Sequence, residues 1–105
     1  MTDIVGLLGL GARSGRLRIG VDRVRRALQL DELACVVIAA DATGRVEDKV
    51  VRLARARRVP LVQGPSASKL GATVGKPPVM VVGVEERALA AGIVGRTSPK
   101  GTREE

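Results

Sequence analysis

The hydrophobic positions along the chain follow two alternating patterns. In several segments apolar residues recur about every 3.6 positions, and short runs rich in valine and isoleucine separate these segments. The first pattern is typical of helices with one buried side, and the second is typical of buried strands. We therefore predict an α/β fold in which helices pack on a sheet.

Helices are predicted wherever the longer period holds. They cover residues 4–14, 21–30, 45–57 and 85–94, together with a brief helix that starts at Ser66 or Ser68 and contains Leu70. Asp3 is a candidate cap for the first helix, and Asp41 and Thr43 are candidate caps for the third. Gly15 and Gly20 mark the turns on either side of the first strand.

Strands are predicted for the short apolar runs. They cover residues 16–19, 34–39, 60–63 and 79–84. The run 34–39 is apolar throughout, as expected of a strand covered on both faces, so Cys35 is predicted to lie in the core. One domain, residues 1–95, accounts for all of these elements. Residues 96–105 are polar and contain Pro99, and we expect them to form a flexible tail.

The composition excludes several classes of protein. No phenylalanine, tryptophan, tyrosine or histidine occurs among the 105 residues, so neither aromatic stacking of bases nor histidine catalysis is possible. With Cys35 as the one cysteine, a monomer cannot form a disulfide or an ordinary zinc site, which fits a reducing compartment. The apolar runs are short for a membrane span, and we expect no secretory leader. The expectation is a cytoplasmic monomer without metal or cofactor.

Catalysis is not predicted either. Adjacent carboxylates, Glu47 with Asp48 and Glu85 with Glu86, are expected on exposed helical turns and do not converge as an acid and a base would. The glycine-rich residues 9–15 only superficially resemble a dinucleotide-binding loop, because the residues before them have a helical pattern rather than that of a strand. We therefore expect a binding protein rather than an enzyme.

Positive charge is concentrated near the start of the chain. The protein has 18 lysines and arginines against 11 acidic residues, and residues 1–30 hold six arginines against two aspartates. The predicted strand 16–19 and the helix start after it carry the candidate ligand-binding residues, which are Arg16, Arg18, Gly20, Asp22, Arg23 and Arg26. N–H groups at a helix start can receive phosphate, and arginine can bind phosphate or guanine. The alternative is a solvated surface on which Asp22 and Arg26 form a salt bridge.

Three motifs carry a resemblance to a known family. Residues 7–17, Leu-Leu-Gly-Leu-Gly-Ala-Arg-Ser-Gly-Arg-Leu, are similar to the opening Leu-Leu-Gly-Leu-Ala-x-Arg-Ala-Gly-Lys-Leu of its bacterial members. Residues 36–41 are similar to its buried strand ending in Ala-Glu-Asp, and residues 69–76 are similar to its later Leu-Gly-x-x-x-Gly turn. Over residues 4–94 the chain resembles the kink-turn RNA-binding ribosomal-protein superfamily, and within it the small YlxQ-type members.

The resemblance implies a three-layer α/β/α sandwich with a small mixed central sheet. It also implies recognition of kink-turn RNA, a sharply bent RNA helix with tandem sheared G·A pairs and a flipped-out nucleotide. The family's Gly-x-Asn-Glu-x-x-Lys element reads the G·A pairs, and by position it falls on Gly20, Asp22, Arg23 and Arg26. Arg26 keeps the positive charge, whereas Asp22 replaces an amide and Arg23 replaces an acidic residue. One hypothesis is that Asp22 accepts from guanine N–H groups while Arg23 binds a phosphate.

A second implied contact is the family's apolar loop near the flipped-out nucleotide. By position it falls on Gly75, Lys76, Pro77, Pro78 and Val79. The two prolines would keep this loop rigid, or they serve only to end the preceding helix before a buried strand.

These observations predict a non-enzymatic RNA-binding protein that resembles a ribosomal protein. Its expected partner is a structured RNA, either ribosomal RNA or another kink-turn RNA. The protein is also expected to associate with the ribosome. One alternative is a general basic ribosome-associated or assembly factor without kink-turn selectivity, which Asp22 and Arg23 suggest. Another is a protein-interaction module that uses the third helix and its end, residues 45–58.

Overall fold

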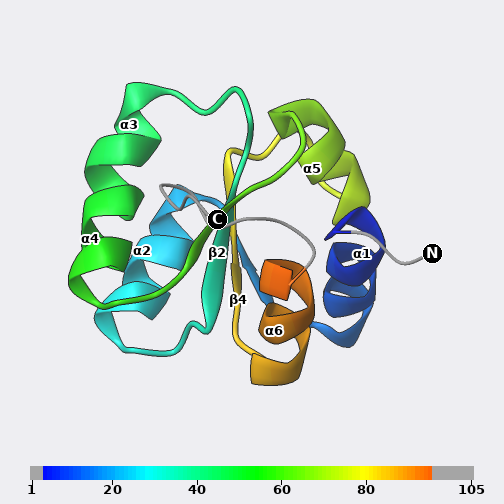
Figure 1. Ribbon diagram of the computed structural model, residues 1–105. Coiled ribbons are helices and arrows are strands. Elements are labelled where there is room, and N and C mark those ends of the chain that lie inside the picture. The colour runs from blue at the N-terminus through cyan, green and yellow to red at the C-terminus, as the bar shows by residue number, and fades with distance from the viewer. Residues whose placement is uncertain (1–3, 96–105) are drawn as a thin grey trace.

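The computed structural model describes residues 4–95 and arranges them in three layers (Figure 1). The helices are α1 (Ile4–Ser14), α2 (Val21–Gln29), α3 (Gly44–Val46), the π-helical segment η1 (Glu47–Val51), α4 (Arg52–Ala56), α5 (Ala67–Thr73) and α6 (Arg87–Gly95). The strands are β1 (Leu17–Ile19), β2 (Cys35–Ile38), β3 (Leu61–Gln63) and β4 (Val81–Val84). The predicted tail 96–105 and the predicted cap Asp3 lie outside the described residues.

The four strands form one mixed sheet in the order β1-β4-β2-β3. Strand β4 pairs antiparallel with both β1 and β2, and β2 pairs parallel with β3. At one end of the sheet Ile19 lies opposite Val82, directly before the chain enters α2. At the other end Val84 lies opposite both Leu17 and Cys35. We call these the α2 end and the α6 end, because α6 follows β4 there.

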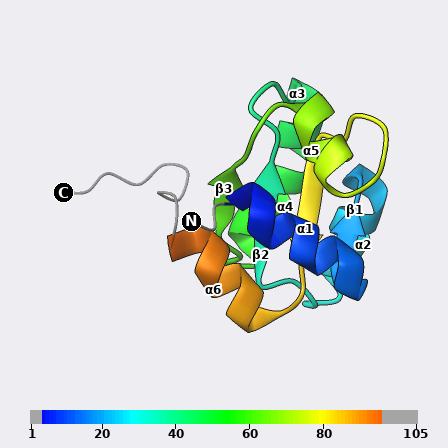
Figure 2. The same cartoon turned by 90° about the vertical axis from the view of Figure 1, so that its right-hand side faces the viewer.

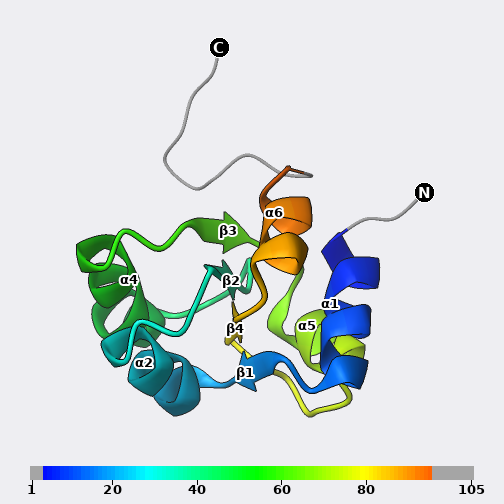
Figure 3. The ribbon, with the colours of Figure 1, turned by 90° about the horizontal axis from the view of Figure 1, so that it is seen from below.

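Helices cover both faces of the sheet. Figure 3 shows α2 and α4 on one side of the strands and α1, α5 and α6 on the other, and Figure 2 shows α1, α5 and α6 in front of the sheet. All four residues of β2 are buried, because each face of this central strand is covered. The three-layer α/β/α sandwich with a small mixed sheet is thus confirmed.

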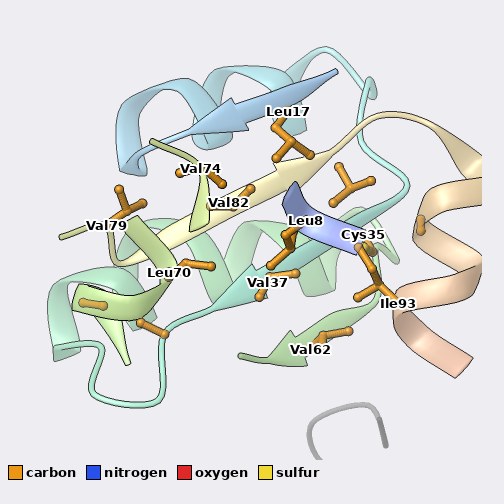
Figure 4. Close-up of a cluster of buried hydrophobic side chains, with 14 residues drawn as sticks. Leu8, Leu17, Cys35, Val37, Val62, Leu70, Val74, Val79, Val82 and Ile93 are labelled. Carbon is orange, nitrogen blue, oxygen red and sulfur yellow. The ribbon is translucent and has the colours of Figure 1, made fainter. Parts of the chain in front are cut away.

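Two hydrophobic clusters fill the spaces between the layers. The cluster on the side of α1, α5 and α6 includes Leu8, Leu70 and Ile93, which surround Val37 and Cys35 (Figure 4). The second cluster joins α2, η1 and α4 to the other face of the sheet, and it includes Leu28, Val36 and Val50. Cys35 is fully buried, as predicted.

The predicted third helix, residues 45–57, contains a wide turn that its sequence did not lead us to expect. The stretch begins as α3, passes through the π-helical η1 and continues as α4. Both Val50 and Val51 are buried, together with Val46 and Ala54. Adjacent residues of an α-helix point about 100° apart, and the extra residue of a π turn lets two neighbouring valines both enter the core.

The predicted role of Asp41 as cap of the third helix is wrong. Its Oδ1 accepts a hydrogen bond from the N–H of Ala67 at 2.7 Å, at the start of α5. Ser66 caps the same helix, because its hydroxyl oxygen accepts a hydrogen bond from the N–H of Lys69. Of the two predicted starts of this helix, Ser66 and Ser68, the first is thus confirmed. Thr43 is the other predicted cap of the third helix, and its backbone carbonyl accepts a hydrogen bond from the N–H of Val46.

Two element boundaries also differ from the prediction. Helix α6 begins at Arg87, so Glu85 and Glu86 precede it instead of lying on its first turn. Strand β4 begins at Val81, because the N–H of Val79 is bound to the carbonyl of Ala67 at 3.0 Å and belongs to the loop before the strand.

Candidate functional site

The structure brings the two predicted ligand-binding segments together in one groove. The groove has a volume of about 480 Å³ and lies between the start of α2 and the loop 75–79 at the α2 end of the sheet. It is lined by Leu17, Ile19, Gly20, Arg23, Lys76, Pro77, Pro78 and Val79. These two segments are more than fifty positions apart in the chain, and the pairing of β1 with β4 makes them neighbours.

Gly20 shapes the α2 side of the groove. Its φ of 100° lies in the left-handed region, which glycine adopts without the steric cost that a side chain adds. Its N–H donates to the carbonyl of Val81 at 3.0 Å, and its own carbonyl accepts the first helical bond, from Val24, at 3.0 Å. No side chain caps the helix. The first N–H groups of α2 are therefore left without a side-chain cap.

The other side of the groove is a loop tied closely to α5. Gly75 has a φ of 74°, and the N–H of Lys76 donates to the carbonyl of Gly71 at 2.8 Å. A Cβ on Gly71 would lie 2.0 Å from the carbonyl oxygen of Pro77, so only glycine allows this approach of loop and helix. The loop thus presents Pro77 and Pro78 to solvent from a fixed backbone.

The groove carries positive charge without an acidic residue in its lining. The side chains of Arg23 and Lys76 are exposed on its two sides. Neither forms an ion pair within the part of the chain that the structure describes. Two cations and the positive end of a helix dipole make this groove suited to an anionic ligand with an apolar part.

Arg18 has a different environment from the one predicted for a ligand-binding arginine. Its guanidinium forms an ion pair with Glu85, and it lies 3.9 Å from a carboxylate oxygen of Glu32. The side chain of Glu85 is only 24% exposed, so this pair is half-buried. Arg18 is therefore paired with acidic residues of the fold, and its predicted contact with a ligand stays a prediction.

The remaining predicted residues lie around the groove rather than in it. Asp22 is exposed on the first turn of α2, and the alternative salt bridge from Asp22 to Arg26 is not formed in the described structure. Arg26 borders a shallow hollow beside the groove, which it shares with Arg23 and Arg18. Arg16 is exposed at the opposite end of β1 from Gly20.

Sequence reasoning missed two groove residues. Leu17 and Ile19 line the groove, although the sequence predicted them only as part of the strand 16–19. Val79 is 8% exposed, so it belongs to the core cluster and contributes a small part of the groove wall. Their position in the strand directly before Gly20 could have identified Leu17 and Ile19 as groove residues.

No other chemistry is evident in the described residues 4–95. Burial raises the pKa of the Cys35 thiol to about 12, which keeps it protonated and unreactive at neutral pH. Among the side chains that the structure describes, there is no group of three or more cysteine, aspartate or glutamate residues placed to hold a metal ion. None of the helices in this part of the chain is long and apolar enough to cross a membrane.

Comparison with known proteins assigns the chain to a family. The model of the ribosomal protein L7Ae/L30e/S12e/Gadd45 family matches residues 2–91, and the chain belongs to this family. The RNA-binding protein BH0128 of Halalkalibacterium halodurans is 39% identical over 59 residues, which are 56% of this chain and 72% of that protein. Both names are those of ribosomal or RNA-binding proteins and not of enzymes, in agreement with the prediction from sequence.

Two solved structures share the fold. A protein of unknown function from Bacillus halodurans C superposes with a TM-score of 0.80 at 25% identity, over 87% of this chain and 92% of that one. A 15.5kD RNA-binding protein of Giardia lamblia superposes with a TM-score of 0.73 at 21% identity, over 89% of this chain and 82% of that one.

Proposed function

We propose that the protein binds structured RNA of the kink-turn type through the start of α2 and the loop 75–79. The observation that carries this proposal is the groove in which Gly20 and Arg23 face Lys76, Pro77 and Pro78. The bacterial relative, which is named an RNA-binding protein, supports RNA as the class of ligand.

The chemistry of the groove suits a bent RNA with one nucleotide turned out of its stack. The uncapped N–H groups of α2 and the charges of Arg23 and Lys76 bind phosphates or base edges. The rigid, apolar surface of Pro77 and Pro78 gives a flipped-out base a place to pack without an aromatic ring. RNA recognition of this kind depends on shape and on unstacked bases more than on sequence read from a groove of the helix.

Asp22 and Arg23 have different roles in this proposal. The carboxylate of Asp22 is exposed and without an ion pair among the described residues, so it can accept from the N–H groups of a sheared guanine. Arg23 lines the groove and binds a phosphate, where its charge adds affinity without selecting a base. The departures from the family's motif then preserve selectivity by a changed set of contacts.

The proposal extends to the setting in which the protein works. We propose a cytoplasmic YlxQ-type monomer that associates with ribosomal RNA or another kink-turn RNA. Residues 1–95 form the RNA-binding domain, and no cofactor takes part.

The test is a titration of two matched RNAs at physiological salt. One contains a kink-turn, and in the other Watson-Crick pairs replace the G·A pairs. We expect a preference of about a hundredfold or more for the kink-turn, which is within the usual range of specific over nonspecific binding. Equal affinities would contradict the proposal and favour a general basic ribosome-associated factor.

Two single variants test the assigned roles in the same titration. D22A is expected to reduce the preference for the kink-turn, because it removes an acceptor for guanine. R23A is expected to weaken both RNAs alike, because it removes a phosphate contact. The reverse pattern would show that the roles of Asp22 and Arg23 are assigned the wrong way round.

A further inference from the structure

We propose that the exposed side of η1 and α4 is a second RNA-binding surface, which contacts phosphates of the RNA beyond the groove. It consists of Lys49, Arg52, Arg55 and Arg58, which we call the basic face. The inference rests on the proposed function for the identity of the partner. It concerns a part of the molecule that the groove does not include.

The basic face is a row of like charges. Its four members are exposed, and each follows the one before by three residues. Residues three apart are offset by about 60° around an α-helix, so each member lies beside the next and the row curves around the exposed side of the helix. Arg58 continues the row past the end of α4, where its φ of 59° turns the chain toward β3.

These charges are not neutralised by the fold. Arg52 lies 3.8 Å from Asp48, with both side chains largely exposed, and such a pair contributes little. Among the side chains that the structure describes, no ion pair involves Lys49, Arg55 or Arg58. Like charges at this spacing repel one another, so the row lowers helix stability unless a polyanion binds it. The dipole at the end of α4 compensates Arg55 but not Lys49, which lies a turn and a half earlier.

The basic face fits a phosphate backbone better than it fits a protein. The core of a protein interface is depleted of charge and enriched in large apolar or aromatic residues. In the described part of the chain, the exposed large apolar residues are Leu10 and Leu30, and neither belongs to the basic face. A row of arginines with no apolar centre matches the electrostatic footprint of nucleic acid.

The basic face also lies on the same layer as α2. Helices α2 and α4 pack beside each other on one face of the sheet (Figure 3). Both run from the α2 end of the sheet toward the α6 end, where the guanidinium of Arg57 pairs with Asp31 at 3.1 Å. An RNA held at the start of α2 therefore has a second basic helix beside it, along which a stem can continue.

The experiment compares a kink-turn RNA with short stems to RNAs in which one or the other stem is longer by about one helical turn. The variant R52A/R55A removes two charges from the basic face. R52K/R55K keeps these charges, and R13A/R87A removes two exposed charges from α1 and α6 on the other layer. Affinities are measured from 50 to 200 mM salt, and circular dichroism checks that each variant is folded.

We expect the wild type to bind one extended RNA more tightly than the short one, and R52A/R55A to lose this gain. Two lost phosphate contacts reduce the salt exponent by about two, so the advantage of the wild type over R52A/R55A should shrink about tenfold between 50 and 200 mM salt. R52K/R55K should behave as the wild type. R13A/R87A should retain the gain from the longer stem.

If R52A/R55A and R13A/R87A bind every RNA alike, with equal salt dependence, the inference is overturned and an acidic protein surface becomes the partner to test. This result is distinguishable from a failure of the proposed function. If the proposed function failed, the wild type itself would not prefer the kink-turn. The difference between the two double variants would still decide whether the basic face binds RNA.

Discussion

The two ends of the sheet carry cations of the same type in different surroundings. At the α2 end, Arg23 and Lys76 face a groove without an acidic residue in its lining. At the α6 end, Arg18 is paired with Glu85 and Arg57 is paired with Asp31. The first two charges are available to a ligand, and the second two are already compensated within the fold.

The difference shows that the number of arginines in a segment does not locate a binding site. Arg18 and Arg23 are five residues apart in the chain, and both were candidates for RNA contact. The carboxylate that reaches Arg18 comes from the far end of β4, and it pairs this arginine within the fold. The presence or absence of an acidic partner distinguishes the two arginines.

The largest effect is expected from Gly71, which holds the groove loop against α5. In G71A the new Cβ would meet the carbonyl of Pro77, so the loop must move and the free energy of unfolding should fall by about 2 kcal/mol or more. RNA affinity should fall with it, since Pro77 and Lys76 are displaced. Urea unfolding and RNA titration measure the two effects.

The matched control is Gly9 in α1, where an added Cβ would have no neighbour within 4 Å. G9A should be neutral or should stabilise the protein by about 0.5–1 kcal/mol, because alanine favours a helix. If G71A and G9A behaved alike, the loop would not depend on the close approach at Gly71.

A pair of arginine variants tests the comparison between the two ends directly. R18A leaves the half-buried Glu85 without its cation, so we expect a loss of about 1 kcal/mol in the free energy of unfolding and little change in RNA affinity. R23A should leave stability within about 0.5 kcal/mol of the wild type and lower RNA affinity about tenfold. A stability loss in R23A with unchanged RNA binding would reverse the assignment of the two ends.

A smaller effect is expected from Cys35, which begins β2 at the α6 end. Burial raises the pKa of its thiol from 9.0 to about 12, so between these values the unfolded chain loses a proton that the folded chain keeps. Stability therefore falls as the pH rises from about 9 toward 12, by about 1 kcal/mol per pH unit from this group. The slope of unfolding free energy against pH in this range should be shallower in C35A than in the wild type, and an equal slope would indicate that the thiol is accessible to solvent.

Much of the fold was predictable because local pattern and tertiary burial agree. The run at Cys35 to Ile38 is apolar on both faces, and the strand it predicts is buried on both faces. Asp41 shows where such prediction ends. Its carboxylate caps α5 rather than the nearer third helix, because the fold brings the end of β2 beside the start of α5, and no local pattern contains that contact.

The candidate site was predictable in its parts and not in its assembly. The motifs at Gly20 and Gly75 named the two segments, but their meeting in one groove depends on the pairing of β1 with β4. The pairing of Arg18 with Glu85 has the same origin. Contacts between residues far apart in the chain decide which charged side chains are free, and the order of residues alone does not determine them.

The π turn at Glu47–Val51 also affects how the chain tolerates insertion and deletion. A π turn holds one residue more than an α turn, so deleting a single residue there would restore an ordinary helix instead of breaking it. In a continuous α-helix a one-residue deletion would rotate every later residue by about 100° about the helix axis, whereas here the turn takes up the change and the residues of α4 keep their outward side chains. Loss of one residue at this point would therefore leave the outer surface of the helix and the strands on either side in place, so evolution can shorten the chain here at low cost.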